Sequence, residues 1–104
     1  MPQQFDNVTV VCKANVYFDG KVVSHTILDH DQKRTVGLIY PGNFTFNTDA
    51  AERMDIIVGR CRVKVAGDSD WTIHASGSSF LVPAKSSFEI AVETGIAEYV
   101  CTFG

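Results

Sequence analysis

Residues 42–59, GNFTFNTDAAERMDIIVG, decide the fold of this 104-residue chain. The stretch begins with the alternation of a β-strand, in which Phe44, Phe46 and Thr48 fall on one face. A turn rich in Asp and Ala follows, and Glu52 comes next, ahead of an apolar run that a glycine ends. The pattern therefore predicts an aromatic strand face that is followed, across a turn, by a single carboxylate.

The spacing inside this stretch is that of a metal-binding motif whose two histidine ligands are missing. Position 46, position 48, Glu52 and Gly59 fit the end of the pattern H-x-H-x3-E-x6-G, the first motif of the cupin proteins. In this chain Phe46 and Thr48 stand where that pattern has two metal-binding histidines. The sequence therefore resembles a cupin without its metal site, and we expect no bound metal.

The second half of the chain carries the second cupin motif, G-x5-P-x-G-x2-H-x3-N, in a similarly altered form. Gly77 and Pro83 match its first glycine and its proline. Lys85 replaces the second glycine, Phe88 replaces the histidine, and Val92 replaces the asparagine. In both motifs an aromatic residue thus occupies a ligand position. The second motif keeps its spacing, whereas the upstream glycine of the first is displaced, since Gly42 lies nearer position 46 than the pattern expects.

Composition limits the kind of protein. A chain of 104 residues with 45% hydrophobic and 11% aromatic residues is one domain with a real core. The net charge of −3 and the pI near 5.4 argue against a nucleic-acid polymer or an anionic membrane surface as partner. No apolar run is long enough to span a membrane, and the N-terminus lacks the pattern of a signal peptide.

Three cysteines, Cys12, Cys61 and Cys101, lie in apolar, strand-like contexts without C-x-x-C spacing. This pattern favours buried, reduced thiols over a disulfide framework or a zinc site. We therefore expect a cytoplasmic protein.

Strand patterns follow one another along the chain, and no window has the periodicity of a helix. Residues 8–16 predict a first strand, Asp19-Gly20 a tight turn, and residues 30–34 a loop or hairpin tip. About ten short strands in a chain of this length are typical of a closed β-sandwich or barrel. The sequence therefore predicts an all-β antiparallel fold.

From residue 15 onward the chain resembles the pyrimidine/purine nucleoside phosphorylase family of small single-domain cupins. The resemblance rests on these residues: Asn15-x-Tyr17-Phe18-x-Gly20-Lys21-Val22, Val36-Gly37, Gly42-x-Phe44-Thr45-Phe46-x-Thr48, Glu52-x-Met54, Gly59, Asp70-Trp71, Gly77-Ser78-x-Phe80-x-Val82-Pro83, Phe88 and Tyr99-x-Cys101. It implies an RmlC-like jelly-roll, an antiparallel β-barrel formed by residues 15–104, with residues 1–14 as an N-terminal extension. Residues 84 and 85 depart from the Gly-His expected after the proline.

The resemblance also implies an activity. Inorganic phosphate, as co-substrate, attacks C1′ of a purine or pyrimidine nucleoside, and ribose 1-phosphate and the free base are formed without a metal or other cofactor. Positive charge develops on the ribose ring in such glycosidic cleavages, so preorganised electrostatics should supply much of the acceleration. The family resemblance further implies a homodimer or larger assembly.

Glu52 is the candidate catalytic residue. In a cupin this carboxylate points into the barrel, where it can accept hydrogen bonds from ribose hydroxyls or stabilise the ring cation. The alternative is a solvated turn carboxylate paired with Arg53. The retained motif spacing favours the functional interpretation.

The candidate substrate-binding residues share the same predicted interior: Phe44, Phe46, Thr48 and Phe88. The aromatic side chains either stack on the base, which suits a broad substrate range, or simply fill the space of a lost metal site. The Thr48 hydroxyl either contacts ribose or phosphate or is satisfied within its strand.

Phosphate binding needs cations or oriented N–H groups. Arg34, Arg53 and Lys85 lie in predicted loops that can reach the barrel mouth, and we expect one of them to bind phosphate. The cations within residues 60–64 alternate with apolar residues, so we expect them on a solvated outer face.

Two other classes of function stay open beside the phosphorylase. A metal-dependent cupin enzyme is disfavoured, because only Glu52 remains at a ligand position. A non-catalytic cupin that binds a small ligand or dimerises would use the aromatic residues only as core. Incubation with a nucleoside in the presence and absence of phosphate separates these classes.

Overall fold

The structure is a computed structural model that describes residues 3–104. Its elements are strands joined by turns, with one short 3₁₀ turn, η1, at Phe18–Gly20. The strands are β1 (Thr9–Val10), β2 (Asn15–Tyr17), β3 (Val22–Asp29), β4 (Gln32–Ile39), β5 (Gly42–Asn47), β6 (Glu52–Val58), β7 (Arg60–Val65), β8 (Thr72–Ala75), β9 (Ser79–Val82), β10 (Ser87–Val92) and β11 (Ala97–Phe103). The prediction of an all-β fold is confirmed.

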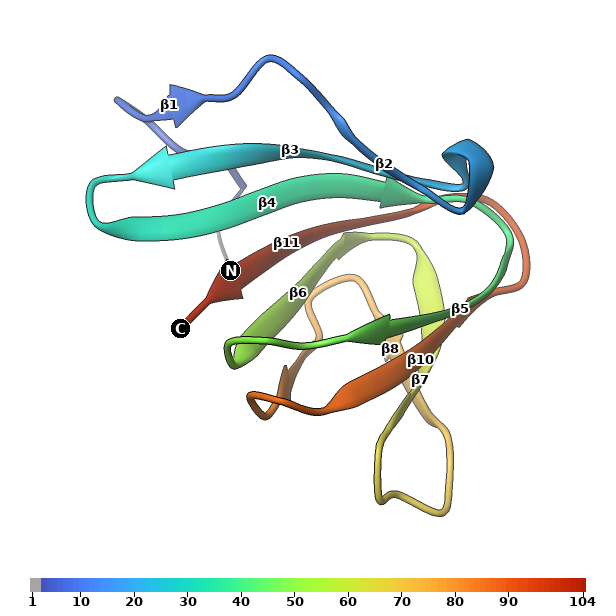
Figure 1. The fold of residues 1–104 in the computed structure, drawn as a ribbon. Helices are drawn as coiled ribbons and strands as arrows, with labels where there is room; N and C mark the ends of the chain where they lie inside the picture. The colour runs from blue at the N-terminus through green and yellow to red at the C-terminus, as the bar shows by residue number, and fades with distance from the viewer. Residues whose placement is uncertain (1–2) are drawn as a thin grey trace.

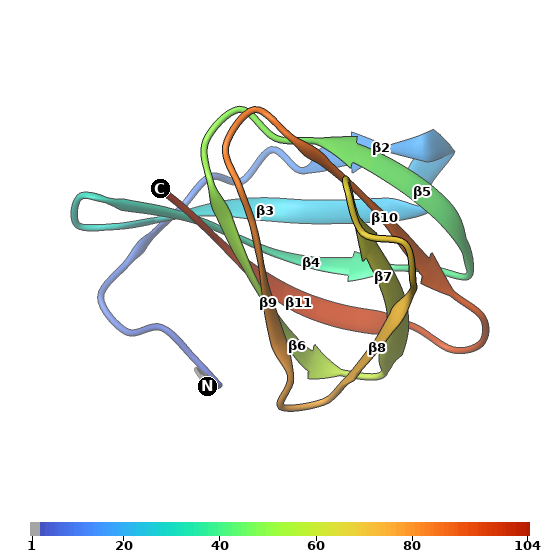
Figure 2. The same ribbon diagram turned by 90° about the horizontal axis from the view of Figure 1, so that it is seen from below.

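Two antiparallel sheets face one another (Figure 1). The larger sheet has seven strands in the order β1-β3-β4-β11-β6-β9, and β2 also pairs with β3. The smaller sheet has four strands in the order β5-β10-β7-β8 and covers part of one face of the larger sheet (Figure 2). This arrangement is a jelly-roll of two layers.

The predicted closure into one barrel is wrong, because no ladder of hydrogen bonds joins the two sheets in the described part of the chain. Side chains connect them at one edge instead. The Tyr17 ring lies edge-on to Phe46 with centroids 5.9 Å apart, and the Phe18 ring lies 4.9 Å from Phe44. Contacts between aromatic rings thus replace strand pairing where β2 and η1 meet β5.

The core lies between the sheets, because the strands turn alternate side chains inward. The largest fully buried side chains come from both layers: Val22, Ile39, Ile56, Cys61, Val63, Val82 and Ile90. On β7 the apolar residues face this core while Arg60 is exposed, and Arg62 reaches the outer Glu93 carboxylate at 3.1 Å. The predicted outward placement of the cations in residues 60–64 is confirmed.

The N-terminal strand is shorter than predicted. Instead of one strand over residues 8–16, β1 and β2 pair separately with β3. From Val10 to Asn15 the chain advances five positions, whereas their partners on β3, Ile27 and Ser24, are only three positions apart. Two extra residues therefore leave the ladder, and Cys12, which lies in this bulge, is exposed rather than buried.

The turn between β2 and β3 forms as predicted from Asp19-Gly20. Phe18, Asp19 and Gly20 all have positive φ, at 52°, 54° and 88°. Left-handed backbone is unfavourable for most residues, and glycine and aspartate tolerate it best. The turn presents the Phe18 ring to β5, which helps to define the edge of the space between the sheets. The division into an extension of residues 1–14 and a domain of residues 15–104 stays a prediction.

Candidate functional site

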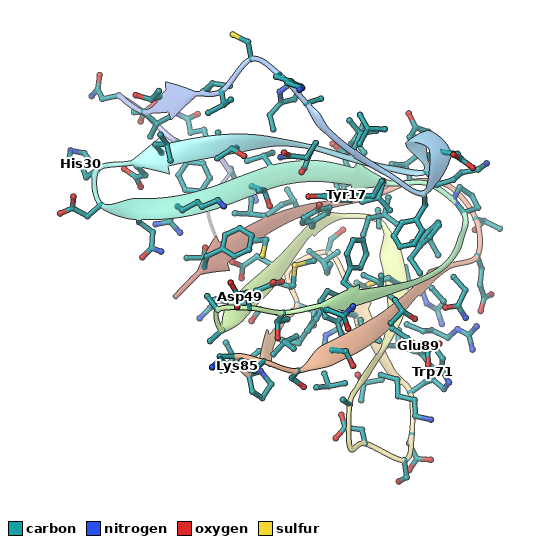
Figure 3. All side chains as sticks on the ribbon, in the orientation of Figure 1. Tyr17, His30, Asp49, Trp71, Lys85 and Glu89 are labelled. Carbon is teal, nitrogen blue, oxygen red and sulfur yellow. The ribbon has the colours of Figure 1, made fainter. Side chains whose placement is uncertain are left out.

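A cavity of about 440 Å³ lies between the sheets. Its apolar wall consists of Tyr17, Ile39, Phe46, Met54, Phe88, Ile90 and Phe103, and its polar wall consists of Asn15, Ser24, Thr26, Thr35 and Tyr99. Glu52, Cys101, Lys33 and the β5–β6 turn with Asp49 complete the lining. Figure 3 shows Tyr17 and Asp49 at two separate places around this space.

Two stacked phenylalanines form the centre of the apolar wall. Phe46 on β5 and Phe88 on β10 are direct cross-strand partners, and their ring centroids are 5.6 Å apart with an interplanar angle of 23°. Phe44 lies two positions earlier on β5 but packs in the core beside Phe18 and does not line the cavity. The prediction that all three rings share one cavity is therefore correct for two of them.

The polar wall depends on a glycine. Gly37 on β4 pairs with Ser24 on β3 and with Tyr99 on β11. A Cβ atom at Gly37 would lie only 2.8 Å from the Tyr99 hydroxyl, so a side chain here would displace that hydroxyl from its hydrogen bond with Ser24. Burial raises the pKa of Tyr99 to about 12, so the phenol stays protonated at neutral pH. Asn15 Nδ2 donates to Ser24 Oγ at 3.3 Å, which extends the network.

Glu52 is the first residue of β6, and its half-buried side chain lines the cavity. The Cys101 thiol donates a hydrogen bond to Glu52 Oε1 at 3.4 Å. Burial raises the pKa of the Glu52 carboxyl, and the Cys101 hydrogen bond opposes this rise. Arg53 points to the opposite face of the sheet, where it pairs with Asp55 Oδ1 at 3.3 Å. Glu52 is therefore a cavity carboxylate and not the partner of Arg53.

Thr48 lies outside the cavity and holds two loops together. Its buried hydroxyl donates to the Pro83 carbonyl at 2.7 Å and accepts from the Ser86 N–H at 2.9 Å. A further hydrogen bond to the same residue runs from the Thr48 backbone N–H to the Ser86 carbonyl and is 2.9 Å long. The protein thus satisfies this hydroxyl, as in the alternative to a substrate contact, but the partners lie in the loop before β10 and not in its own strand.

This placement gives a prediction for stability. Thr48→Val should lower the free energy of unfolding by about 1–3 kcal/mol, because the buried Thr48 hydroxyl makes two hydrogen bonds, to the Pro83 carbonyl and from the Ser86 N–H, and both are lost. Chemical denaturation of the parent and the variant measures the difference. Thr48→Ser keeps the hydroxyl and should retain most of the stability, whereas equal losses in both variants would contradict the hydrogen-bond account.

Of the three predicted phosphate-binding cations, two point away from the cavity. Arg34 donates to Thr102 Oγ1 at 2.7 Å and lies 3.5 Å from an Asp29 carboxylate oxygen on the outer face of the larger sheet. Arg53 lies on that same face. Lys85 occupies an exposed turn with φ at 52°, and its N–H donates to the Asp49 carbonyl at 3.2 Å. Figure 3 shows Lys85 and Asp49 close together at one end of the smaller sheet.

The lysine that lines the cavity is Lys33, which the sequence interpretation missed. Its Nζ lies 5.0 Å from the centroid of the Phe103 ring, also in the cavity wall. Residues 30–34 were predicted as a loop or hairpin tip. The tip is confirmed at residues 30 and 31, but β4 begins at Gln32, so strand alternation extends further than expected. Because Thr35 faces the cavity, the same alternation places Lys33 on the cavity side of the sheet, where it is exposed, and Arg34 on the outer face. Extending the strand pattern by two residues would have found it.

No group of three or more His, Cys, Asp or Glu side chains that could hold a metal ion occurs among residues 3–104. The histidines lie apart, and each forms a hydrogen bond with a nearby group: His25 with the Val11 carbonyl, His30 with Asp29, and His74 with Ser78. In the same described part of the chain, no helix is long and apolar enough to cross a membrane.

A model of the pyrimidine/purine nucleoside phosphorylase family matches residues 12–103. The chain belongs to this family. It is 55% identical over 102 residues to the pyrimidine/purine nucleoside phosphorylase of Thiobacillus denitrificans, with 97% of this chain and 98% of the relative covered. The enzyme of the same name from Aromatoleum aromaticum is 52% identical over 105 residues, covering 100% of this chain and 98% of the relative. The family predicted from the sequence is confirmed.

Solved structures support the same fold. A crystal structure of a protein of unknown function from Acinetobacter sp. ADP1 superposes with a TM-score of 0.93 at 44% identity, covering 97% of this chain and 98% of that one. A cupin domain from Schizosaccharomyces pombe superposes with a TM-score of 0.65 at 11% identity, over 79% of this chain and 60% of that one. The second match bears on the fold alone, and it confirms the predicted cupin jelly-roll.

Proposed function

We propose that the protein catalyses the phosphorolysis of purine and pyrimidine nucleosides to the free base and ribose 1-phosphate. The observation that supports this most directly is the cavity, in which a pair of stacked aromatic rings faces a wall of hydroxyl and amide groups. Nucleosides have the same two-part character, an aromatic base joined to a polyhydroxylated ring. Membership of the nucleoside phosphorylase family supports the reaction type.

The base would stack on the Phe46–Phe88 pair. Stacking on an aromatic side chain tolerates different bases, because every base presents a π-face. No residue of the apolar wall demands a particular pattern of hydrogen bonds from the base. This wall therefore suits a broad range of nucleosides.

The ribose would lie against the polar wall, with its hydroxyls within reach of Asn15, Thr26 and Thr35. In the reaction a phosphate oxygen forms a bond to C1′ while the bond from C1′ to the base nitrogen breaks, and the electron pair of that bond leaves with the base. Positive charge develops on the ring as the bond breaks. The Glu52 carboxylate, held in a partly buried site, would stabilise that charge or bind the ribose hydroxyls.

Lys33 is the strongest candidate for the phosphate site, since its ammonium group belongs to the same cavity as Glu52. Lys33→Met should raise the KM for phosphate by about 10- to 100-fold, the usual effect of losing a hydrogen bond to a charged group. Initial rates at varied phosphate and saturating nucleoside measure this change. Lys64→Met, on the outer face of the smaller sheet, is the matched control and should leave the KM unchanged. An unchanged KM for phosphate in Lys33→Met would contradict this assignment and make Lys85 the candidate for phosphate binding.

The activity itself is tested by incubating the purified protein with uridine and with adenosine, in the presence and absence of phosphate. We expect free base and ribose 1-phosphate in equal amounts, and neither product without phosphate. Release of base without phosphate would indicate a hydrolase. Binding of nucleoside without turnover under either condition would favour the alternative, a non-catalytic cupin that binds a small ligand.

A homodimer and a cytoplasmic location complete the proposal. The outer face of the larger sheet carries exposed apolar side chains: Val16, Val36, Val58 and Leu81. Apolar residues on one sheet face suit a self-complementary contact between two copies. Free cysteines suit a reducing compartment. Light scattering at micromolar concentration tests the assembly, and a monomer there would contradict it.

A further inference from the structure

Cys101 on β11 lies beside Glu52 on β6, in the wall of the candidate site. The two strands are direct neighbours, and Cys101 pairs with Met54, two positions after Glu52. The Cys101 side chain is only 3% exposed, and its thiol donates to Glu52 Oε1 at 3.4 Å. Among the described residues, the Cys101 thiol is the hydrogen-bond donor to the Glu52 side chain.

Thr35 lies beside the thiol on the other side. It is the cross-strand partner of Cys101 on β4, and its side chain opposes the rise in the pKa of the thiol. Thr35 is itself 8% exposed, so it has little freedom to turn away. Thr35, Cys101 and Glu52 therefore lie on three adjacent strands, and the thiol hydrogen bond holds one oxygen of the carboxylate.

We propose that Cys101 is a positioning residue for the reaction, which orients the Glu52 carboxylate through the thiol hydrogen bond. The proposal rests on the phosphorylase function argued above. The thiol itself does not react with substrate. Burial and the neighbouring Glu52 carboxylate both raise the pKa of the Cys101 thiol, so it stays protonated and keeps its donor hydrogen at neutral pH.

Other titratable groups share the cavity with Glu52. Tyr99 from β11, Tyr17 from β2, Lys33 from β4 and Asp49 from the β5–β6 turn line the same cavity. Strands β9 and β10 contribute the apolar Val82 and Phe88. On the far side of β6 the Asp55 carboxylate is paired with Arg53. A substitution at residue 101 removes none of these groups, so the comparison of alanine, valine and serine at this position tests the thiol hydrogen bond itself.

The test is a titration of the Glu52 carboxyl carbon by NMR in the parent and in Cys101→Ala and Cys101→Ser. Loss of the donor in Cys101→Ala should raise the pKa of Glu52, because a hydrogen bond to the ionised carboxylate is removed. Cys101→Ser supplies a hydroxyl donor and should bring the pKa back to the parent value or below it. Cys101→Val, which keeps the volume without a donor, replaces the alanine variant if that variant is unfolded.

Kinetics give the second readout. The acid limb of the kcat/KM profile should move to higher pH in Cys101→Ala, and kcat should fall by about 2- to 10-fold, with recovery in Cys101→Ser. Cys61→Ala is the matched control, since Cys61 is equally buried but lies on β7 and does not line the cavity.

The proposal is overturned if the pKa of Glu52 is the same in Cys101→Ala as in the control variant Cys61→Ala. It is also overturned if the pKa moves while kcat and the acid limb stay at the parent values. A parent protein without phosphorolysis would instead refute the proposed function, and the NMR titration would still report the contact because it needs no substrate.

Discussion

Glu52→Gln should reduce kcat for phosphorolysis by about 10²- to 10³-fold, the typical loss when one preorganised electrostatic contact is removed. Glutamine keeps the shape of the side chain and its hydrogen bond with Cys101, but it carries no charge to stabilise the developing ring cation. Steady-state kinetics with uridine at saturating phosphate measure the change. Glu89→Gln, on the outer side of β10, is the matched control and should retain the parent kcat.

The same substitution has a defined effect on stability. Burial raises the pKa of Glu52 above its usual value of 4.5, so the folded state holds this proton more tightly than the unfolded chain does. The resulting stabilisation is fully present below pH 4.5 and is lost as the pH rises through the pKa of the folded state. Glutamine does not ionise, so Glu52→Gln should be at least as stable as the parent at pH 7. If Glu52→Gln has the kcat of the parent, Glu52 has a structural role and takes no part in catalysis.

The sequence predicted the parts of this site that depend on local alternation. The period of two on β5 correctly turned Phe46 toward the interior, and the motif spacing correctly placed Glu52 across the turn from it. The same alternation was misapplied to Thr48, which follows the end of β5 at Asn47. At that point the chain has left the sheet, and its hydroxyl meets the loop before β10 instead of the cavity.

The polar wall could not be predicted, because it depends on pairing between distant segments. Asn15, Ser24 and Tyr99 come together only because β2, β3, β4 and β11 are neighbours in one sheet. The need for Gly37 appears only when the Tyr99 hydroxyl is seen beside it. Lys33 was missed for a local reason, since its polar neighbours suggested a loop where the β3–β4 hairpin continues as strand. Charged residues near a hairpin tip are therefore poor markers of where a strand ends.

Phe88→Ala should have the largest effect on stability, lowering the free energy of unfolding by about 3–5 kcal/mol. Phe88 is 3% exposed and packs against Phe46 and Phe80, with ring centroids 5.6 and 5.8 Å away. Its removal leaves a cavity at the centre of the smaller sheet. For a domain whose total stability is of order 5–15 kcal/mol, this loss should lower Tm by more than about 10 °C. Thermal unfolding followed by circular dichroism measures it.

Phe46→Ala separates stacking on the base from packing in the core. Phe46 lies on the edge strand β5 and is only partly buried, so its removal should cost less stability than removal of Phe88. Loss of a stacking surface should raise the KM for uridine and for adenosine alike, by about 5- to 150-fold, because base–aromatic stacking contributes about 1–3 kcal/mol per base. Phe44→Ala, a core residue on the same strand, should destabilise the fold without this change in KM. If Phe46→Ala and Phe44→Ala alter stability alone, the aromatic face is core, and the base must bind at the polar wall.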